Sequence, residues 1–170
     1  MAEREVQMQR DVQILMGSNS DAPVMRKAVE VLDALGVTSH MTVASAHRSP
    51  ARVQRIIAEA PSGGVKVFIV GAGAAAHLAG VVAAHSALPV IGVPIDSSPL
   101  KGWDALLATV QMPPGVPVAT VSVGAAGAVN AAVLAAQILA LSDARVAERL
   151  AAYKAGLAEK VERAAATLEQ

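Results

Sequence analysis

The chain has no cysteine, and it has only one phenylalanine, one tyrosine and one tryptophan. Without cysteine there can be no disulfide, no thiolate ligand for a metal and no cysteine nucleophile. Lysine plus arginine and aspartate plus glutamate number 14 each, so the formal net charge is zero at pH 7. Binding of nucleic acid favours a basic surface, and binding of single strands also favours stacking aromatics. We therefore expect no nucleic-acid partner.

Only one segment, residues 125–141, is apolar enough to suggest a membrane helix. It is slightly short for a span and contains Asn130 and Gln137, which favours a helix buried inside protein. Residues 1–10 form a polar extension without the apolar stretch of a secretory signal. We expect no membrane partner and a cytoplasmic protein.

Short apolar runs alternate with helical patterns along most of the chain. The run Val12–Met16 is followed by apolar residues at helical spacing over 23–35. Four further runs follow the same rule. The run at 41–43 precedes a helical segment near 51–60, and the run at 65–70 precedes one that ends near 86. The run at 90–95 precedes a helical segment at 100–110, and the run at 118–123 precedes one that starts at about 125. Apolar runs of this kind indicate parallel strands covered on both faces. We predict a single domain over residues 1–170, a flavodoxin-like three-layer α/β sandwich whose central parallel sheet has about five strands.

The end of the chain, residues 142–170, has the pattern of a charged amphipathic helix with Ser142 as a plausible N-cap. One apolar stripe comprises Val146, Leu150, Tyr153, Leu157, Val161 and Leu168. Such a helix would be roughly 40 Å long, more than one small domain can cover. We expect its stripe to pack on another subunit of a homo-oligomer.

The loops that follow strands of a parallel sheet meet at one edge, where ligands bind. After the first run, Ser18, Ser20 and Asp21 precede a helix, and free N–H groups with hydroxyls suit a phosphate, while a carboxylate can accept from ribose hydroxyls. The alternative is that Ser20 or Asp21 only caps the helix.

After the second run, the sequence "SAHRSP" places His47 beside Arg48. A guanidinium can bind a phosphate or carboxylate with two hydrogen bonds, and an imidazole can exchange a proton near physiological pH. The alternative is an ordinary surface pair. Ser45 lacks the Gly-x-Ser-x-Gly context of a hydrolase nucleophile.

After the third run, "GAGAAAHLAG" partly imitates a dinucleotide-binding fingerprint, but it opens the third strand-helix unit instead of the first. We favour a wall of small residues around Gly73, where backbone approaches a ligand, with His77 near the helix start. The histidines lack the short paired spacing of a zinc site, so we expect no metal. Trp103, in a long proline-rich segment after the fourth run, fits either a lid or the core.

Taken together, these motifs resemble the bacterial N5-carboxyaminoimidazole ribonucleotide mutases of purine biosynthesis, the PurE family, long called the catalytic subunit of phosphoribosylaminoimidazole carboxylase. The resemblance extends from about Val12 to at least Leu141. Its motifs, in order, are "MGSNSD", "SAHRSP", "GAGAAAHLAG", "PVIGVPI", "VQMPPGVPVAT" and "NAAVLAAQILA". It implies an octamer in which the C-terminal helix lies between subunits.

The resemblance also implies a reaction without cofactor or metal, in which a carboxyl group moves from the exocyclic nitrogen of the substrate to ring carbon 4. His47 matches the catalytic residue that carries the proton. Ser18, Asp21 and Arg48 match nucleotide contacts, with Arg48 and the serine loop at the 5′-phosphate. The loop around Gly73 would enclose the carboxyl group, and His77 would line that pocket. The predicted binding residues also include Ser20 and Ser45.

Three departures from the family pattern are Ser49 for threonine, Ala74 for glycine and Ala79 for proline. If position 74 needs a positive φ, alanine there costs roughly 1–2 kcal/mol. Two alternatives to the mutase stay open. One is direct carboxylation of aminoimidazole ribonucleotide by carbon dioxide, and the other is a non-catalytic nucleotide-binding module.

Overall fold

The computed structural model describes residues 10–168, and its centre is a sheet of five parallel strands in the order β2-β1-β3-β4-β5. The strands are β1 (Val12–Met16), β2 (Ser39–Val43), β3 (Val67–Gly73), β4 (Val90–Ile95) and β5 (Ala119–Thr120). This order is that of flavodoxin-like sheets, with the topological switch point between β1 and β3. The predicted fold class is confirmed.

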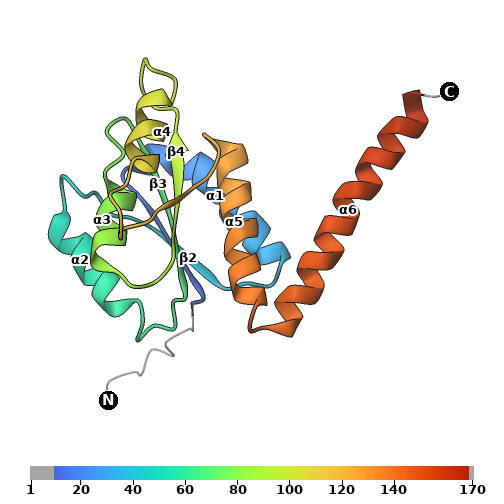
Figure 1. Cartoon of the computed structure of the whole chain (residues 1–170), viewed down its shortest axis with the longest axis horizontal. Coiled ribbons are helices and arrows are strands. Elements are labelled where there is room, and N and C mark those ends of the chain that lie inside the picture. The colour runs from blue at the N-terminus through green and yellow to red at the C-terminus, as the bar shows by residue number, and fades with distance from the viewer. Residues whose placement is uncertain (1–9, 169–170) are drawn as a thin grey trace.

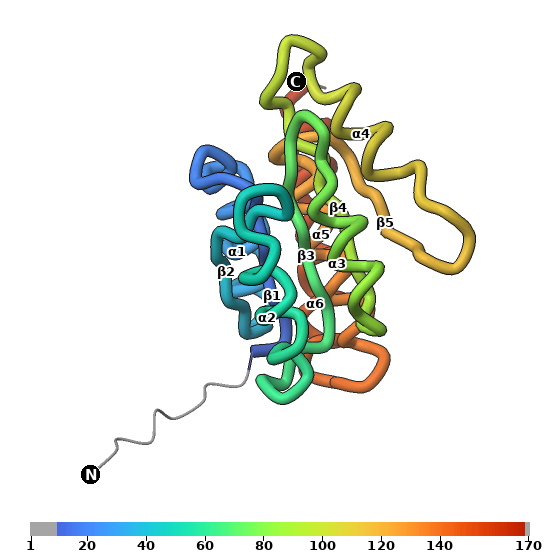
Figure 2. Tube along the Cα trace, turned by 90° about the vertical axis from the view of Figure 1, so that its left-hand side faces the viewer, coloured from blue at the N-terminus to red at the C-terminus, as the bar shows by residue number. Residues whose placement is uncertain are grey.

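Helices cover both faces of the sheet (Figures 1 and 2). On one face lie α1 (Ala22–Ala34) and α5 (Ala125–Ala140). On the other lie α2 (Pro50–Glu59), α3 (Leu78–His85) and α4 (Trp103–Val110). Successive strand residues alternate between the two cores: Ile14 packs on the α1 side and Leu15 on the opposite side, and both are fully buried.

Three strands differ from their predicted bounds. β2 begins at Ser39, two residues before the predicted run at 41–43. β3 begins two residues later than predicted and continues through Gly73, so glycines assigned to a loop belong to the sheet. Glycine is a poor strand former, but here β1 and β4 flank the strand: Met16 pairs with Gly71, and Ile95 pairs with Gly73. β5 covers two residues instead of 118–123, and it pairs with Ile91 and Gly92 near the start of β4.

The last helix, α6 (Ala144–Leu168), begins later than predicted and leaves the body of the molecule (Figure 1). The predicted N-cap, Ser142, is wrong. The Asp143 carboxylate takes this role, because its Oδ1 accepts a hydrogen bond of 2.9 Å from the N–H of Arg145. Ser142 instead lies in the turn, and its hydroxyl donates to the carbonyl of Leu139.

Only the beginning of the α6 stripe packs against the rest of the chain. Val146 and Leu150 are buried. Farther along, Leu157, Val161 and Leu168 are 45%, 66% and 88% exposed. The apolar face that begins in the core therefore continues into solvent.

Trp103, for which the sequence left two alternatives, is 67% exposed at the start of α4, so it is not a core residue. Leu100, in the turn before α4, and Leu107, on α4, are exposed as well. Within residues 10–168, no helix is long and apolar enough to cross a membrane.

Asp11 joins the beginnings of three strands at the edge where β1 starts. Its N–H donates to the carbonyl and hydroxyl of Thr38, and its carbonyl accepts from the N–H of Lys66 and of Val67. Its carboxylate accepts from the Thr38 hydroxyl at 2.7 Å and pairs with Lys66 Nζ at 2.9 Å. Burial acts to raise the pKa of Asp11, but these hydrogen bonds and the Lys66 charge outweigh it and lower the pKa below 3.8.

Replacing Asp11 by asparagine should therefore destabilise the fold in a pH-dependent way. A lowered pKa in the folded state adds stability above the ordinary value of 3.8, and this stability is lost as pH falls through the folded-state pKa. Because both side chains are partly exposed, we expect a loss of about 1 kcal/mol or less at pH 7. Urea denaturation at pH 7 and pH 3 measures it, and an equal loss at both pH values would contradict this explanation.

Candidate active site

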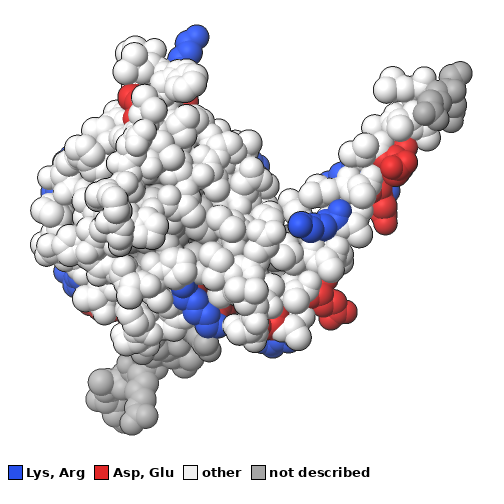
Figure 3. Space-filling model, viewed as in Figure 1, with Lys and Arg blue, Asp and Glu red and all other residues white. Residues whose placement is uncertain are grey.

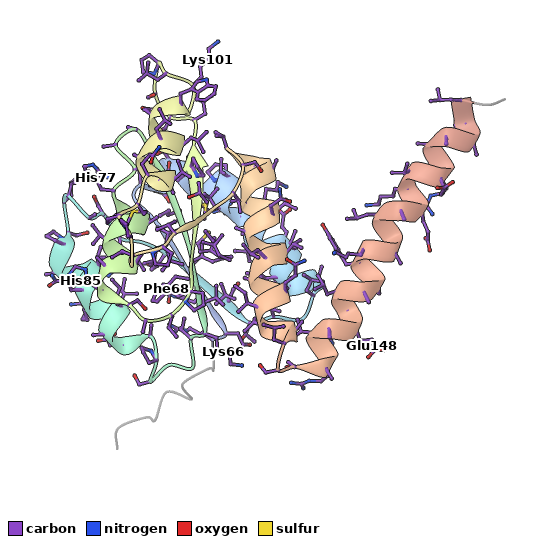
Figure 4. All side chains as sticks on the ribbon, in the orientation of Figure 1. Lys66, Phe68, His77, His85, Lys101 and Glu148 are labelled. Carbon is purple, nitrogen blue, oxygen red and sulfur yellow. The ribbon has the colours of Figure 1, made fainter. Side chains whose placement is uncertain are left out.

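The loops after β1, β2, β3 and β4 surround a cavity of about 410 Å³ at the carboxyl edge of the sheet. In Figure 4, His77 marks this edge, whereas Lys66 lies at the opposite end of the molecule, just before β3. The cavity is lined by Gly17, Ser18, Ser20, Asp21, Ser45, Ala46, His47, Arg48, Ala72, Gly73, Ala76, His77, Leu78 and Ser97. All of the site residues predicted from the sequence lie in this lining, and the roles assigned to them stay predictions.

The loop after β1 is held by a reciprocal pair of hydrogen bonds around a short 3₁₀ turn, η1 (Asn19–Asp21). The Ser18 hydroxyl accepts from the N–H of Ser20 at 3.3 Å, and the Asp21 carboxylate accepts from the N–H of Ser18 at 3.2 Å. This capping box shapes the loop. At the start of α1 itself, Asp21 makes no side-chain capping bond; its carboxylate belongs to the capping box of the preceding turn.

Asp21 is almost completely buried beside the cavity. Burial raises its pKa above 3.8, although the hydrogen bonds from Ser18 and Ser20 and the charge of Arg48 act to lower it. The carboxylate therefore has less solvation than it would have in water. A ligand hydroxyl that donates to it would restore part of this solvation.

Arg48 connects the loops after β1 and β2. Its Nη2 donates to the carbonyl of Gly17 at 2.9 Å, and its backbone N–H donates to the Ser45 hydroxyl at 3.2 Å. A guanidinium has five N–H donors, so most remain for a ligand after the bond to Gly17. The arrangement brings a fixed positive charge to the serine loop, where an anion can bind.

His47, from the loop after β2, and His77, from the loop after β3, are in contact in the lining of the cavity. His47 Nε2 is 2.7 Å from His77 Nδ1, and the rings meet edge to face at a centroid distance of 4.8 Å. One proton must lie between these two nitrogens, because a hydrogen bond needs one donor and one acceptor. The sequence placed both histidines near a site, but it gave no sign that residues 30 positions apart would be in contact.

Ser97, in the loop after β4, is the lining residue with a reactive or hydrogen-bonding side chain that the sequence analysis missed. It is the second residue after β4, which is the position that places a side chain at the carboxyl edge. That position is the signal in the sequence that could have identified Ser97 as a site residue.

Within residues 10–168, no group of three or more histidine, aspartate or glutamate residues is arranged to hold a metal ion.

Comparison with known proteins places the chain in a family. Residues 11–160 match the model of the family described as AIR carboxylase. The chain belongs to the AIR carboxylase family. The N5-carboxyaminoimidazole ribonucleotide mutase of Brucella melitensis is 49% identical over 154 residues, 91% of this chain and 95% of that protein. The enzyme of the same name from Bacillus subtilis is 53% identical over 143 residues, 84% of this chain and 88% of that protein.

A solved structure agrees with this placement in the AIR carboxylase family. The crystal structure of Treponema denticola PurE aligns with a TM-score of 0.85 at 29% identity, over 94% of this chain and 98% of that chain. The family match includes every residue that lines the cavity. The cavity therefore lies in the part of the chain that matches the family.

In this AIR carboxylase family member, the loop after β3 includes strained backbone. Ala74 has a φ of 51° and Ala76 a φ of 44°. A left-handed conformation costs an L-residue roughly 1–2 kcal/mol, and glycine does not pay it. Position 74 therefore has the positive φ at which the sequence predicts strain. The N–H of Ala76 donates to the carbonyl of Gly73 at 3.0 Å and closes the turn.

Ala74→Gly should stabilise the protein. The relief of backbone strain exceeds the added entropy of the unfolded chain, and the net gain should be up to about 1 kcal/mol. Ala75 is exposed as well and does not have a positive φ, so Ala75→Gly is the matched control and should destabilise by about 0.5–1 kcal/mol. Urea denaturation of both variants measures the difference, and the same sign for the two changes would show that position 74 is not strained.

Proposed function

We propose that this member of the AIR carboxylase family converts N5-carboxyaminoimidazole ribonucleotide into 4-carboxyaminoimidazole ribonucleotide in purine biosynthesis. Relatives of that name, about half identical in sequence, align over most of this chain. The protein is thus an isomerase, a mutase that moves a carboxyl group within its substrate. The observation that supports the chemistry is the contact between His47 and His77 inside the cavity.

The proposed reaction has two steps. First the bond between the exocyclic nitrogen and the carboxyl carbon breaks, carbon dioxide forms, and the nitrogen keeps the electron pair and takes a proton from His47. Then carbon 4 of the electron-rich ring attacks the carbon dioxide, and His47 removes the proton from carbon 4. The proton lent in the first step returns in the second, so one imidazole serves as acid and base.

His77 has a positioning role in this proposal. Its Nδ1 accepts from, or donates to, His47 Nε2, so it fixes which way the His47 ring faces. The reaction consumes no other reactant, because the carboxyl group stays with the ring system. The protein therefore needs to hold the substrate, move one proton and keep water out.

The other end of the cavity fits the nucleotide part of the substrate. Arg48 supplies the positive charge, and Ser18 and Ser20 supply hydroxyls for the 5′-phosphate. Asp21, whose buried carboxylate lacks full solvation, is placed to accept from ribose hydroxyls. Ser45 orders the backbone of Arg48 through its hydroxyl. Binding of a nucleotide here is a proposal that these five residues support.

His47→Asn should abolish conversion while the substrate still binds. The amide keeps a polar side chain at the exposed position but cannot carry a proton between nitrogen and carbon 4. The measurement is formation of 4-carboxyaminoimidazole ribonucleotide without ATP or added bicarbonate, with calorimetry for binding. Undiminished turnover in the variant would remove His47 from the chemistry.

The same product assay, run with other substrates and additions, separates the alternatives. Conversion of aminoimidazole ribonucleotide only with added carbon dioxide would identify a direct carboxylase. Binding without any conversion would identify a non-catalytic nucleotide-binding module. A nicotinamide cofactor should not change the melting temperature. A cytoplasmic location also stays a prediction.

A homo-oligomer is part of the proposal, and the resemblance implies an octamer. The exposed residues Leu157 and Val161 continue the stripe that Val146 and Leu150 begin in the core. In Figure 3 the middle of the visible face of the body has few charged side chains, whereas both signs occur along α6. Exposed apolar surface of this kind indicates a protein contact, and a second copy of the chain is the occupant we propose.

Changing Leu157 and Val161 together to glutamine should reduce the assembly. Both side chains are exposed in the single chain, so its fold should be kept while the contact loses apolar area. Light scattering at micromolar concentration should give a multiple of the subunit mass for the intact protein and a smaller mass for the variant. Lys160→Gln, an exposed polar position on the same helix, is the control. A monomeric intact protein would contradict the proposal.

A further inference from the structure

We propose that Ser97 is a substrate-binding residue whose hydroxyl donates a hydrogen bond to the carboxyl group that migrates, and so retains carbon dioxide between the two steps. This inference rests on the proposed mutase function and assigns a new residue to it. Ser97 comes from the loop after β4, whereas the other predicted polar residues of the site come from the loops after β1, β2 and β3.

Packing places the Ser97 hydroxyl directly over the end of β3. A side chain at position 73 would collide with Ser97 Oγ, and its Cβ would also lie 3.0 Å from the carbonyl of Ile95. The absence of a side chain at Gly73 therefore gives Ser97 its place in the wall of the cavity. His77 follows four residues after Gly73 in the same wall, so the hydroxyl and the histidine pair border one space.

The Ser97 hydroxyl is available to a ligand. Among residues 10–168 it has no hydrogen-bond partner within the protein, although it is accessible at the cavity. The adjacent serine is different, because the Ser98 hydroxyl accepts from the N–H of Leu100 at 3.1 Å and thus stabilises the loop. Two neighbouring serines accordingly have separate uses.

A neutral donor suits the chemistry of this space better than a cation. A positive charge would bind the carboxylate of the substrate more tightly than uncharged carbon dioxide, and this would slow cleavage of the carbon–nitrogen bond. The arginine in the cavity lining, Arg48, is tied to Gly17 in the loop after β1. A hydroxyl can hold the carboxylate without adding charge, and it leaves the released carbon dioxide beside carbon 4.

The test uses substrate with a ¹³C-labelled carboxyl group in buffer that contains unlabelled bicarbonate. The intact protein should keep the label in its product. Ser97→Ala should release label, accumulate aminoimidazole ribonucleotide, and lower kcat/KM by about 10-fold or more, as loss of a hydrogen bond to a charged group does. Ser98→Ala, a change in the same loop, is the control and should keep the label.

A second variant probes the packing. Gly73→Ala should displace the Ser97 hydroxyl and release label in the same way, and the double variant should lose little more than either single one, because both changes remove one interaction. Circular dichroism establishes that each variant is folded.

The outcomes distinguish the two proposals. If the intact protein converts substrate and Ser97→Ala keeps both the label and kcat/KM, the role of Ser97 is wrong and the mutase function stands. Equal loss in Ser98→Ala would assign the effect to the loop and also overturn the inference. If the intact protein converts nothing, the mutase function fails, and the role of Ser97 fails with it.

Discussion

The end of β3 has no side chains where the rest of the site needs space. At Gly71 a Cβ would collide with Met25 of α1, and at Gly73 it would collide with Ser97 of the loop after β4. Both collisions concern the same central strand, approached from different elements. Because Gly71 and Gly73 lack side chains, α1 packs closely at Gly71 and the loop after β4 packs closely at Gly73. The wall of the cavity depends on Gly73, because a larger residue at this position would displace Ser97.

The positions of the charged groups in the site depend on contacts between the loops at the carboxyl edge of the sheet. Arg48, from the loop after β2, donates to the carbonyl of Gly17, which holds its positive charge beside the loop after β1. Asp21 is buried beside it with a raised pKa, which leaves the carboxylate ready to accept a hydrogen bond. The two ends of the cavity thus differ: charged groups gather at one, and His47 with His77 faces small residues at the other.

The sequence predicted those parts of the structure that follow from local patterns. Apolar runs and helical spacing gave the parallel sheet, and the rule that loops meet at the carboxyl edge gathered His47, Arg48 and Gly73 in one cavity. What it missed depends on tertiary contacts. The glycines that end β3 form strand because β1 and β4 pair with them, which local propensity does not show. Likewise, the contact of His47 with His77 depends on how two loops face each other.

The projecting helix α6 is the last element of the chain to be synthesised. All five strands precede α6 in the sequence, so the sheet can form before the last helix leaves the ribosome, and Val146 and Leu150 of that helix then complete the core on the α1 side. The residues that stay exposed on that helix are the last to appear. A nascent chain therefore presents the exposed part of this apolar stripe only after all five strands of its own sheet have been synthesised.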